Sequence, residues 1–346
     1  MIEEAGLTFD VESADVPNKE MTHFYNPVMR VNRDLSLLAL EAKQYPETKA
    51  VFPLAATGVR PLRVVNECTE WSHLYVNDIK PSFQDVFRVA AEQNDVSLDN
   101  VTLSSEDARS LPFTLPSYDF IEIDPYGSPN QFLDSAVQKL RHLGILAVTA
   151  TDTAPLCGTY ISTCRRKYWA RPRRNDMMKE IGARILVRKA QLVGAQHEKA
   201  LHPLFTVAKD HYLKVVFQCT GSKKDANNIL KQHETREHEG ITVGPLWTGS
   251  LQNQDYLKKM QGCSHITVSD ETASFLDGLV SESKVDVYGF YDIHGEMKQA
   301  GGGSPPKTAA VLESLRENGF LAEKTHFAET GVKTDAPRDV FHGVLT

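Results

Sequence analysis

The chain has 346 residues, and its 38 Lys and Arg stand against 45 Asp and Glu, giving a formal net charge of −7. The length favours two domains, because one hydrophobic core rarely extends beyond about 250–300 residues. The composition is that of a globular protein, no apolar run approaches the roughly 20 residues of a membrane helix, and the negative balance weighs mildly against a nucleic-acid partner.

The amino-terminal segment, "MIEEAGLTFDVESADVP", is acidic and lacks the apolar stretch of a signal peptide. The five cysteines are scattered, odd in number and without a CxxC pair. This pattern argues against a disulfide framework and a zinc site, and it indicates a reducing compartment. We expect a cytoplasmic protein without a membrane partner.

Short apolar strands alternate with amphipathic helices through the first part of the chain. The predicted strands cover residues 50–55, 73–78, 100–108, 118–125 and 144–152. This order predicts βαβ units, and hence an α/β, Rossmann-like fold with a mostly parallel sheet. Ligands bind such sheets at the carboxyl ends of the strands. Four acids lie at these ends: Asp78, Asp107, Asp124 and Asp152.

The pattern changes further along the chain. Residues 211–218 predict another strand, with 240–249 as a candidate partner across a polar insertion. Helices are then predicted at 254–260, 271–283, 291–299 and 305–319, and a strand at 320–327. We therefore divide the chain into domains at 1–250 and 251–346. The second is a smaller α/β domain, for which a winged-helix-like arrangement is one option.

The turn after the first strand, "AATGVR", contains the single glycine Gly58. The G-x-G-x-x-G fingerprint of dinucleotide sites is absent, which disfavours NAD and FAD. A nucleoside without a diphosphate, such as S-adenosylmethionine (SAM), suits this turn, and Asp78 is placed to bind its ribose hydroxyls. At the third strand end, Asp107 and Ala108 could accept the adenine amino group and admit the ring. Each of these residues also fits an ordinary polar turn or helix cap.

The fourth strand ends in "IDPYGSP", where Asp124, Pro125 and Tyr126 follow one another. An exocyclic amine is a poor nucleophile until it becomes pyramidal and sheds a proton. A carboxylate and a backbone carbonyl near one nitrogen favour that change, proline fixes the turn, and an aromatic ring stacks on a flipped base. The alternative is a simple strand-ending turn.

The segment 164–190 carries ten basic residues against Asp176 and Glu180 only. Tyr168 and Trp169 lie among them, as in surfaces that bind phosphates and stack bases. We select Arg165, Arg166, Arg173 and Arg174 as candidate substrate contacts. A solvated helix face is the alternative.

Taken together, these motifs resemble the tRNA (guanine(26)-N2)-dimethyltransferase family, archaeal type, over nearly the whole chain. Besides the motifs above, the resemblance rests on "FYNPVMRVNRDLS", "GPLWTG" and "THFAETGVKTDAP" (Thr325–Pro337). It implies a class I SAM-dependent methyltransferase with a tRNA-handling C-terminal domain, which adds two methyl groups to N2 of guanine 26. The residues alone do not distinguish one methylation from two, nor the oligomeric state.

The resemblance also implies roles for particular residues. SAM would contact Arg33, Arg60, Asp78, Asp107 and Ala108. Asp124 would be the catalytic acceptor beside Pro125 and Tyr126, and Phe24 would help to enclose the target base. Many family members carry paired cysteines before "GPLW", whereas this chain has only Cys219, His233 and His238 there. We therefore predict no metal.

Three rival functions stay open. The first is an amino-methyltransferase acting on another base or nucleic acid, because motifs with D-P and a nearby aromatic serve such enzymes too. The second is a non-catalytic RNA-binding protein of the same fold, against which the intact Asp78 and Asp124 argue. A NAD oxidoreductase is disfavoured by the missing glycines.

Overall fold

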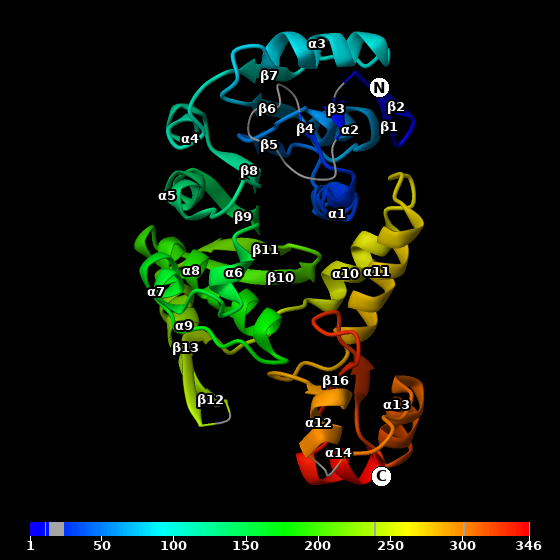
Figure 1. Cartoon of the computed structure of the whole chain (residues 1–346). Coiled ribbons are helices and arrows are strands. Elements are labelled where there is room, and N and C mark those ends of the chain that lie inside the picture. Colours follow the sequence, from blue (N-terminus) through cyan, green and yellow to red (C-terminus); the bar gives the residue numbers. More distant parts are fainter. Residues whose placement is uncertain (11, 14–23, 239, 300–301, 346) are drawn as a thin grey trace.

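The computed structural model describes residues 1–10, 12–13, 24–238, 240–299 and 302–345. A seven-stranded sheet with the order β10-β11-β9-β8-β5-β6-β7 forms its centre (Figure 1). Its strands are β5 (Lys49–Phe52), β6 (His73–Asn77), β7 (Val101–Ser104), β8 (Tyr118–Ile123), β9 (Leu140–Ala150), β10 (Lys199–Lys209) and β11 (Tyr212–Gly221). β5 to β9 are parallel, as predicted, whereas β11 is antiparallel to β9 and to β10.

One predicted pairing is wrong. The strand at 211–218 is β11, but its partners are β9 and β10, and β10 was not predicted. The expected partner forms β13 (Ile241–Trp247), which pairs with β12 (His233–His238) in a separate ribbon. The reason is the tight turn at 210–211, which joins β10 to β11 directly. Pro203, at a register shift of β10, weakens the strand signal in the sequence.

The central strands are buried on both faces, because helices cover each side. In β8, Ile121 and Ile123 pack into one hydrophobic core, whereas Phe120 packs into the other. In β5, Val51 and Phe52 divide between the two cores in the same way. This alternation follows from the two-residue period of a strand.

Each core takes its own set of helices. Beside Phe120 lie α1 (Arg30–Glu41), α2 (Val59–Glu67), α3 (Phe83–Gln93), α10 (Gln254–Gly262) and α11 (Asp270–Glu282). Beside Ile121 lie α5 (Asn130–Gln138), α6 (Thr153–Leu156), α7 (Ile161–Tyr168), α8 (Met178–Gln196) and α9 (Lys223–Leu230), with α4 (Leu111–Thr114) against α5. The amino-terminal part contributes β1 (Ile2–Glu4), β2 (Leu7–Phe9), β3 (Glu12–Ser13), β4 (Phe24–Tyr25) and a short 3-10 helix (Pro27–Met29).

The carboxyl-terminal part has a third core of its own, formed by residues from Ile293 to Leu345. Its elements are β14 (Tyr291–Asp292), α12 (Ile293–Gln299), α13 (Thr308–Glu317), β15 (Ala322–Lys324), β16 (Gly331–Thr334) and α14 (Arg338–Leu345). The strands form a three-stranded antiparallel sheet in the order β14-β16-β15. The boundary at residue 250 and the winged-helix-like arrangement stay predictions. Two helices that follow this boundary, α10 and α11, pack against α1 of the first part.

A buried glutamate at the end of α11 ties this part to the rest of the molecule. Glu282 accepts hydrogen bonds from Thr325 Oγ1 (2.9 Å) and from His326 Nδ1 (2.6 Å). Burial raises the pKa of Glu282, but the charge and hydrogen bonds of His326 hold it below its usual value. Lys333 Nζ lies 3.7 Å from the buried Glu180 of α8. These three side chains of the Thr325–Pro337 segment therefore face the junction between the two parts.

No helix among the described residues is long and apolar enough to cross a membrane.

Candidate active site

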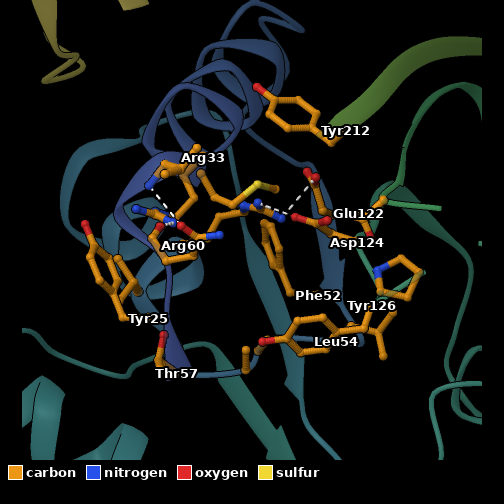
Figure 2. Close-up of a pocket in the computed structure, with 18 of the residues that line it drawn as sticks. Tyr25, Arg33, Phe52, Leu54, Thr57, Arg60, Glu122, Asp124, Tyr126 and Tyr212 are labelled. Atoms are coloured by element: carbon orange, nitrogen blue, oxygen red, sulfur yellow. Dashed lines mark hydrogen bonds and ion pairs between the residues drawn. The ribbon is translucent and has the colours of Figure 1, made fainter. Parts of the chain in front are cut away.

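A cavity of about 460 Å³ opens at the carboxyl ends of β5 and β8 (Figure 2). It is lined by the start of α1 with the segment before it, by the turns after β5 and β8 with Thr151 after β9, and by the turn between β10 and β11. Among the predicted site residues it takes in Arg33, Arg60, Asp124, Pro125 and Tyr126. Its position matches the edge predicted from the acids at the strand ends.

The turn after β5 requires its glycine. Gly58 has a φ of +79°, and a Cβ there would come within 2.3 Å of the Phe87 side chain. Gly58 begins α2, so the helix amino terminus lies beside the cavity. Asp78 Oδ2 accepts a hydrogen bond from Ala56 N (2.9 Å) and so holds this turn. Ala56 lines the cavity, whereas Asp78 lies just behind it.

Asp124 belongs to a network of four charged side chains. Its Oδ2 lies 2.6 Å from Arg60 Nη2, and Arg60 Nη1 lies 3.0 Å from Glu122 Oε1 (Figure 2). Lys214 Nζ of β11 lies 2.5 Å from the same Glu122 oxygen. Burial lowers the pKa of Lys214, and the Glu122 charge opposes that shift. Asn32 of α1 closes the network, because its Oδ1 accepts from both Arg60 and Lys214 at 3.0 Å.

Arg33 is paired with the buried carboxylate of Glu4. Its Nε donates to Glu4 Oε1 (2.9 Å), and its guanidinium lies 4.6 Å from the centre of the Tyr25 ring. Arg63 Nη1 donates to the same Glu4 oxygen (2.8 Å). Burial raises the pKa of Glu4, but Arg33, with the Tyr25 hydrogen bond and the Arg63 charge, outweighs burial and holds that pKa at about 2. Burial raises the pKa of Tyr25, whose hydroxyl donates to Glu4 (2.6 Å), to about 12. Both predicted cofactor arginines therefore line the cavity while bound to acids of the protein.

The turn after β8 is held by the loop that follows β9. Gly127, at a φ of +87°, donates its N–H to Thr151 Oγ1 (2.6 Å), and Thr151 N donates to Gly127 O (3.0 Å). Pro125 and Tyr126 thus line the cavity on a turn whose carboxyl-terminal residue, Gly127, is held by two hydrogen bonds to Thr151. Tyr126 is 55% exposed, and burial of the rest of its ring with the nearby Asp124 charge raises its pKa to about 12.

Asp107 and Ala108 are not among the residues that line the cavity. Asp107 forms an ion pair with Arg109, whose hydrogen bonds lower its pKa to about 2, and Ala108 lies in a hydrophobic core. Phe24 begins β4, but its side chain lies outside the described residues. The roles given to these three residues stay predictions.

Sequence reasoning missed several polar residues of the cavity and its network. They are Asn32, Glu122, Asp210, His211, Tyr212 and Lys214. Glu122 and Lys214 carried a signal, since each is a charged residue in the middle of an apolar strand, and a buried charge needs a partner. The turn at 210–211 carried none, because β10 was not recognised.

The basic segment divides into a buried and an exposed part. Arg184 pairs with Glu180 (2.8 Å) and donates to Gly249 O (2.8 Å), so it serves packing. Tyr168 is buried too, which corrects its expected place on a base-stacking surface: its hydroxyl donates to Asp152 Oδ1 (2.6 Å). Of the four arginines chosen as substrate contacts, Arg165, Arg166 and Arg174 are exposed and Arg173 is half-buried.

The soft donors before "GPLW" have partners or are buried. His233 Nε2 lies 2.8 Å from Gln191 Oε1, and His238 Nε2 lies 2.9 Å from Tyr288 OH. Burial raises the pKa of the Cys219 thiol to about 11. In the described part of the chain, no three His, Cys, Asp or Glu side chains are grouped so that they could hold a metal ion.

The parallel sheet ending in an antiparallel pair, with a cavity at the carboxyl ends of its central strands, defines a Rossmann-like class I methyltransferase. The model of the family "N2,N2-dimethylguanosine tRNA methyltransferase" matches residues 6–238 and 230–346. The chain belongs to this family.

Two relatives and one solved structure are similar to this chain over nearly its full length. A tRNA (guanine(26)-N(2))-dimethyltransferase of Thermococcus kodakarensis is 33% identical over 93% of this chain and 92% of its own. A tRNA (guanine(26)-N(2)/guanine(27)-N(2))-dimethyltransferase of Aquifex aeolicus is 30% identical, over 92% and 88%. Trm1 from Pyrococcus horikoshii, solved with S-adenosyl-L-methionine, superposes with a TM-score of 0.88 at 27% identity, over 100% of this chain and 99% of that one.

Proposed function

We propose that this enzyme transfers methyl groups from SAM to the exocyclic N2 of guanine at position 26 of tRNA, twice, to give N2,N2-dimethylguanosine. The observation that carries the proposal is the fixed Asp124–Pro125–Tyr126 turn at the mouth of the cavity. Family membership supports the same reaction.

The residues of the cavity fit SAM. The volume of about 460 Å³ is within the usual range for small-molecule sites. Phe52 and Leu54 supply an apolar wall, and Glu122 supplies a carboxylate for a ligand that donates hydrogen bonds. Glu122 Oε2 is buried and has no hydrogen-bond partner among the described residues, so one acceptor is left for such a ligand. When bound, SAM supplies an electrophilic methyl group.

Asp124 is the proposed proton acceptor. Its carboxylate would take a hydrogen bond from one N–H of guanine N2 and accept that proton as the nitrogen bonds to the methyl carbon. The carbon–sulfur bond of the sulfonium would break in the same step, leaving its electron pair on the sulfur of a neutral thioether. The Pro125 carbonyl accepts the other N–H, so the nitrogen lone pair points at the methyl group. General-base help of this kind contributes about 10²- to 10⁴-fold in rate. One N–H remains after the first transfer, so the same carboxylate can serve a second.

Arg60 and Tyr126 position these groups. The ion pair between Arg60 and Asp124 fixes the carboxylate next to the cavity. The half-exposed ring of Tyr126 gives a flipped guanine a stacking surface. Asp78 supports the turn that faces the nucleoside part of the cofactor. The proposal also includes direct contacts of SAM with the predicted cofactor residues, and of Phe24 with the base; the cofactor residues are Arg33, Arg60, Asp78, Asp107 and Ala108.

The test uses an unmodified tRNA transcript with G at position 26 and a matched G-to-A transcript. Each is incubated with SAM and the protein, digested, and analysed for methylated nucleosides by mass spectrometry. We expect N2,N2-dimethylguanosine from the G transcript alone. Methylation of both transcripts would contradict the proposed position, and N6-methyladenosine would contradict the proposed base.

Three further parts of the proposal concern the cellular compartment, the metal requirement and the contacts with tRNA. The enzyme acts in the cytoplasm, consistent with its unpaired cysteines. It works without a metal, so chelation with EDTA should leave the product yield unchanged. The exposed arginines Arg165, Arg166 and Arg174, with Arg173, contact tRNA phosphates.

A further inference from the structure

Trp169 has an unusual backbone for its residue type. It ends α7 in the left-handed conformation, with a φ of +56°. Bulky residues rarely adopt this conformation, because their Cβ crowds the neighbouring backbone carbonyl oxygen. Its side chain is nevertheless 50% exposed, so burial of the indole does not explain its presence. A strained, exposed tryptophan is a reason to look for a ligand.

One face of the indole is already covered. Lys189 Nζ lies 3.1 Å from the centre of the ring, and the rest of the lysine is buried. Burial, with the nearby Arg188 charge, lowers the pKa of Lys189 to about 8. Arg188 Nη1 also donates to Trp169 O (3.4 Å). Lys189 therefore covers part of the ring, while Trp169 as a whole stays 50% exposed and leaves indole surface for a ligand.

The surroundings of Trp169 are basic and adjoin the proposed active site. Residues 153–175 contain six Lys and Arg and no Asp or Glu, and the neighbouring Arg165 and Arg166 are exposed. Tyr168 Oη lies 3.0 Å from Ser128 Oγ, two residues beyond Tyr126. Asn130 Nδ2 donates to Lys167 O (2.8 Å). The end of α7 is therefore fixed to the catalytic turn.

We propose that Trp169 is a stacking platform for an unpaired tRNA base next to the target guanine. This inference rests on the proposed function. A planar indole with a cation behind it and arginines around it suits a nucleobase on a phosphate backbone better than a protein partner, because stacking serves the base and Arg serves the phosphates.

The test replaces Trp169 by glycine, because glycine removes the ring and also tolerates the left-handed backbone. We expect Trp169→Gly to fold at least as stably as wild type, to bind SAM equally well, and to bind tRNA about five- to 150-fold more weakly, the range for one lost base stack. The KM for tRNA should rise while kcat at saturating tRNA holds. Trp169→Phe should lose less.

Fluorescence supplies an independent readout. The chain has three tryptophans. Trp247 is buried, and Trp71 is half-buried with its Nε1 donating to Cys68 O (3.0 Å) ahead of β6. Quenching by tRNA should therefore come largely from Trp169 and drop sharply in Trp169→Gly. The matched control is Tyr45→Ala, since Tyr45 is 42% exposed under Lys43 (4.4 Å) and precedes β5, at the opposite edge of the sheet. This variant should bind tRNA like wild type.

The outcomes separate the two proposals. If wild type gives no dimethylguanosine, the proposed function fails. If wild type is active and Trp169→Gly matches it in tRNA affinity and quenching, the stacking platform alone is overturned, and a different partner, such as a protein, becomes the occupant to test.

Discussion

The cavity wall and the exposed basic segment around α7 are both rich in charge, but they use it differently. In the cavity wall, Arg60, Glu122, Asp124 and Lys214 are largely buried and bound to one another. Around α7, four of the six cations in residues 153–175 are exposed and no acid occurs in that segment, although Lys167 pairs with the preceding Asp152 (3.1 Å). The first region is built before any ligand arrives, whereas the second can adjust to a flexible RNA backbone. Chemistry needs fixed groups, and phosphate binding needs mainly a local excess of positive charge.

The largest expected effect is on the chemical step. Asp124→Asn keeps the shape of the side chain but loses the proton acceptor, so kcat should fall about 10²- to 10⁴-fold. SAM binding, measured by calorimetry, should change little by comparison. Asp134→Asn, on the exposed face of α5, is the matched control and should keep wild-type turnover. Full turnover by Asp124→Asn would remove Asp124 from the mechanism.

Breaking the buried network should chiefly affect stability. Glu122→Ala leaves Arg60 and Lys214 with less compensation for their burial. Removing one partner of a buried ion pair typically costs about 3–5 kcal/mol. Urea unfolding should detect the loss. The exposed pair of Lys223 and Glu198 offers the contrast, because Glu198→Ala should change stability by less than about 1 kcal/mol. Equal losses in both variants would contradict the distinction between the two regions.

Glu4, which binds the cavity residue Arg33, should make the stability of the protein sensitive to acid. Its pKa is lowered from 4.5 to about 2 in the folded state, so its contribution to stability is present above pH 4.5 and disappears as the pH falls toward 2. The shift corresponds to about 3 kcal/mol. Glu4→Gln should therefore flatten the acid side of the stability–pH profile measured by denaturant unfolding. An unchanged slope between pH 4.5 and 2 would argue that the partners of Glu4, namely Arg33, Arg63 and Tyr25, do not stabilise this carboxylate.

The smallest effect concerns single cations of the basic segment. Arg165→Ala should weaken tRNA binding modestly and reduce the slope of log affinity against log salt by about 1, the value for one lost phosphate contact. Arg88→Ala, on exposed α3, is the control and should leave the slope unchanged. Filter-binding titrations at several salt concentrations measure both. The same slope in wild type and Arg165→Ala would place the RNA path elsewhere.

Most helices of the carboxyl-terminal part could be predicted from the sequence, because their periodicity is a local feature of the chain. The helices predicted at 254–260, 271–283 and 305–319 overlap α10, α11 and α13 of the structure. The strand at 320–327 is confirmed, although only as the short β15. The junction was not predictable to the same degree, since the bonds from Thr325 and His326 to Glu282 join residues more than 40 positions apart.

The sequence by itself determined the parallel strands, the acids at their carboxyl ends and the order Asp124–Pro125–Tyr126. These are local features, since a strand repeats every two residues and a turn spans only a few. Only the tertiary structure decided which charges meet. Arg60 and Asp124 are 64 residues apart, and Lys214 and Glu122 are 92 apart. The physical reason is that a buried charge costs free energy unless it is paired with an opposite charge. The sequence shows that a partner is needed, but only the packing of sheet and helices determines which residue lies close enough to be that partner.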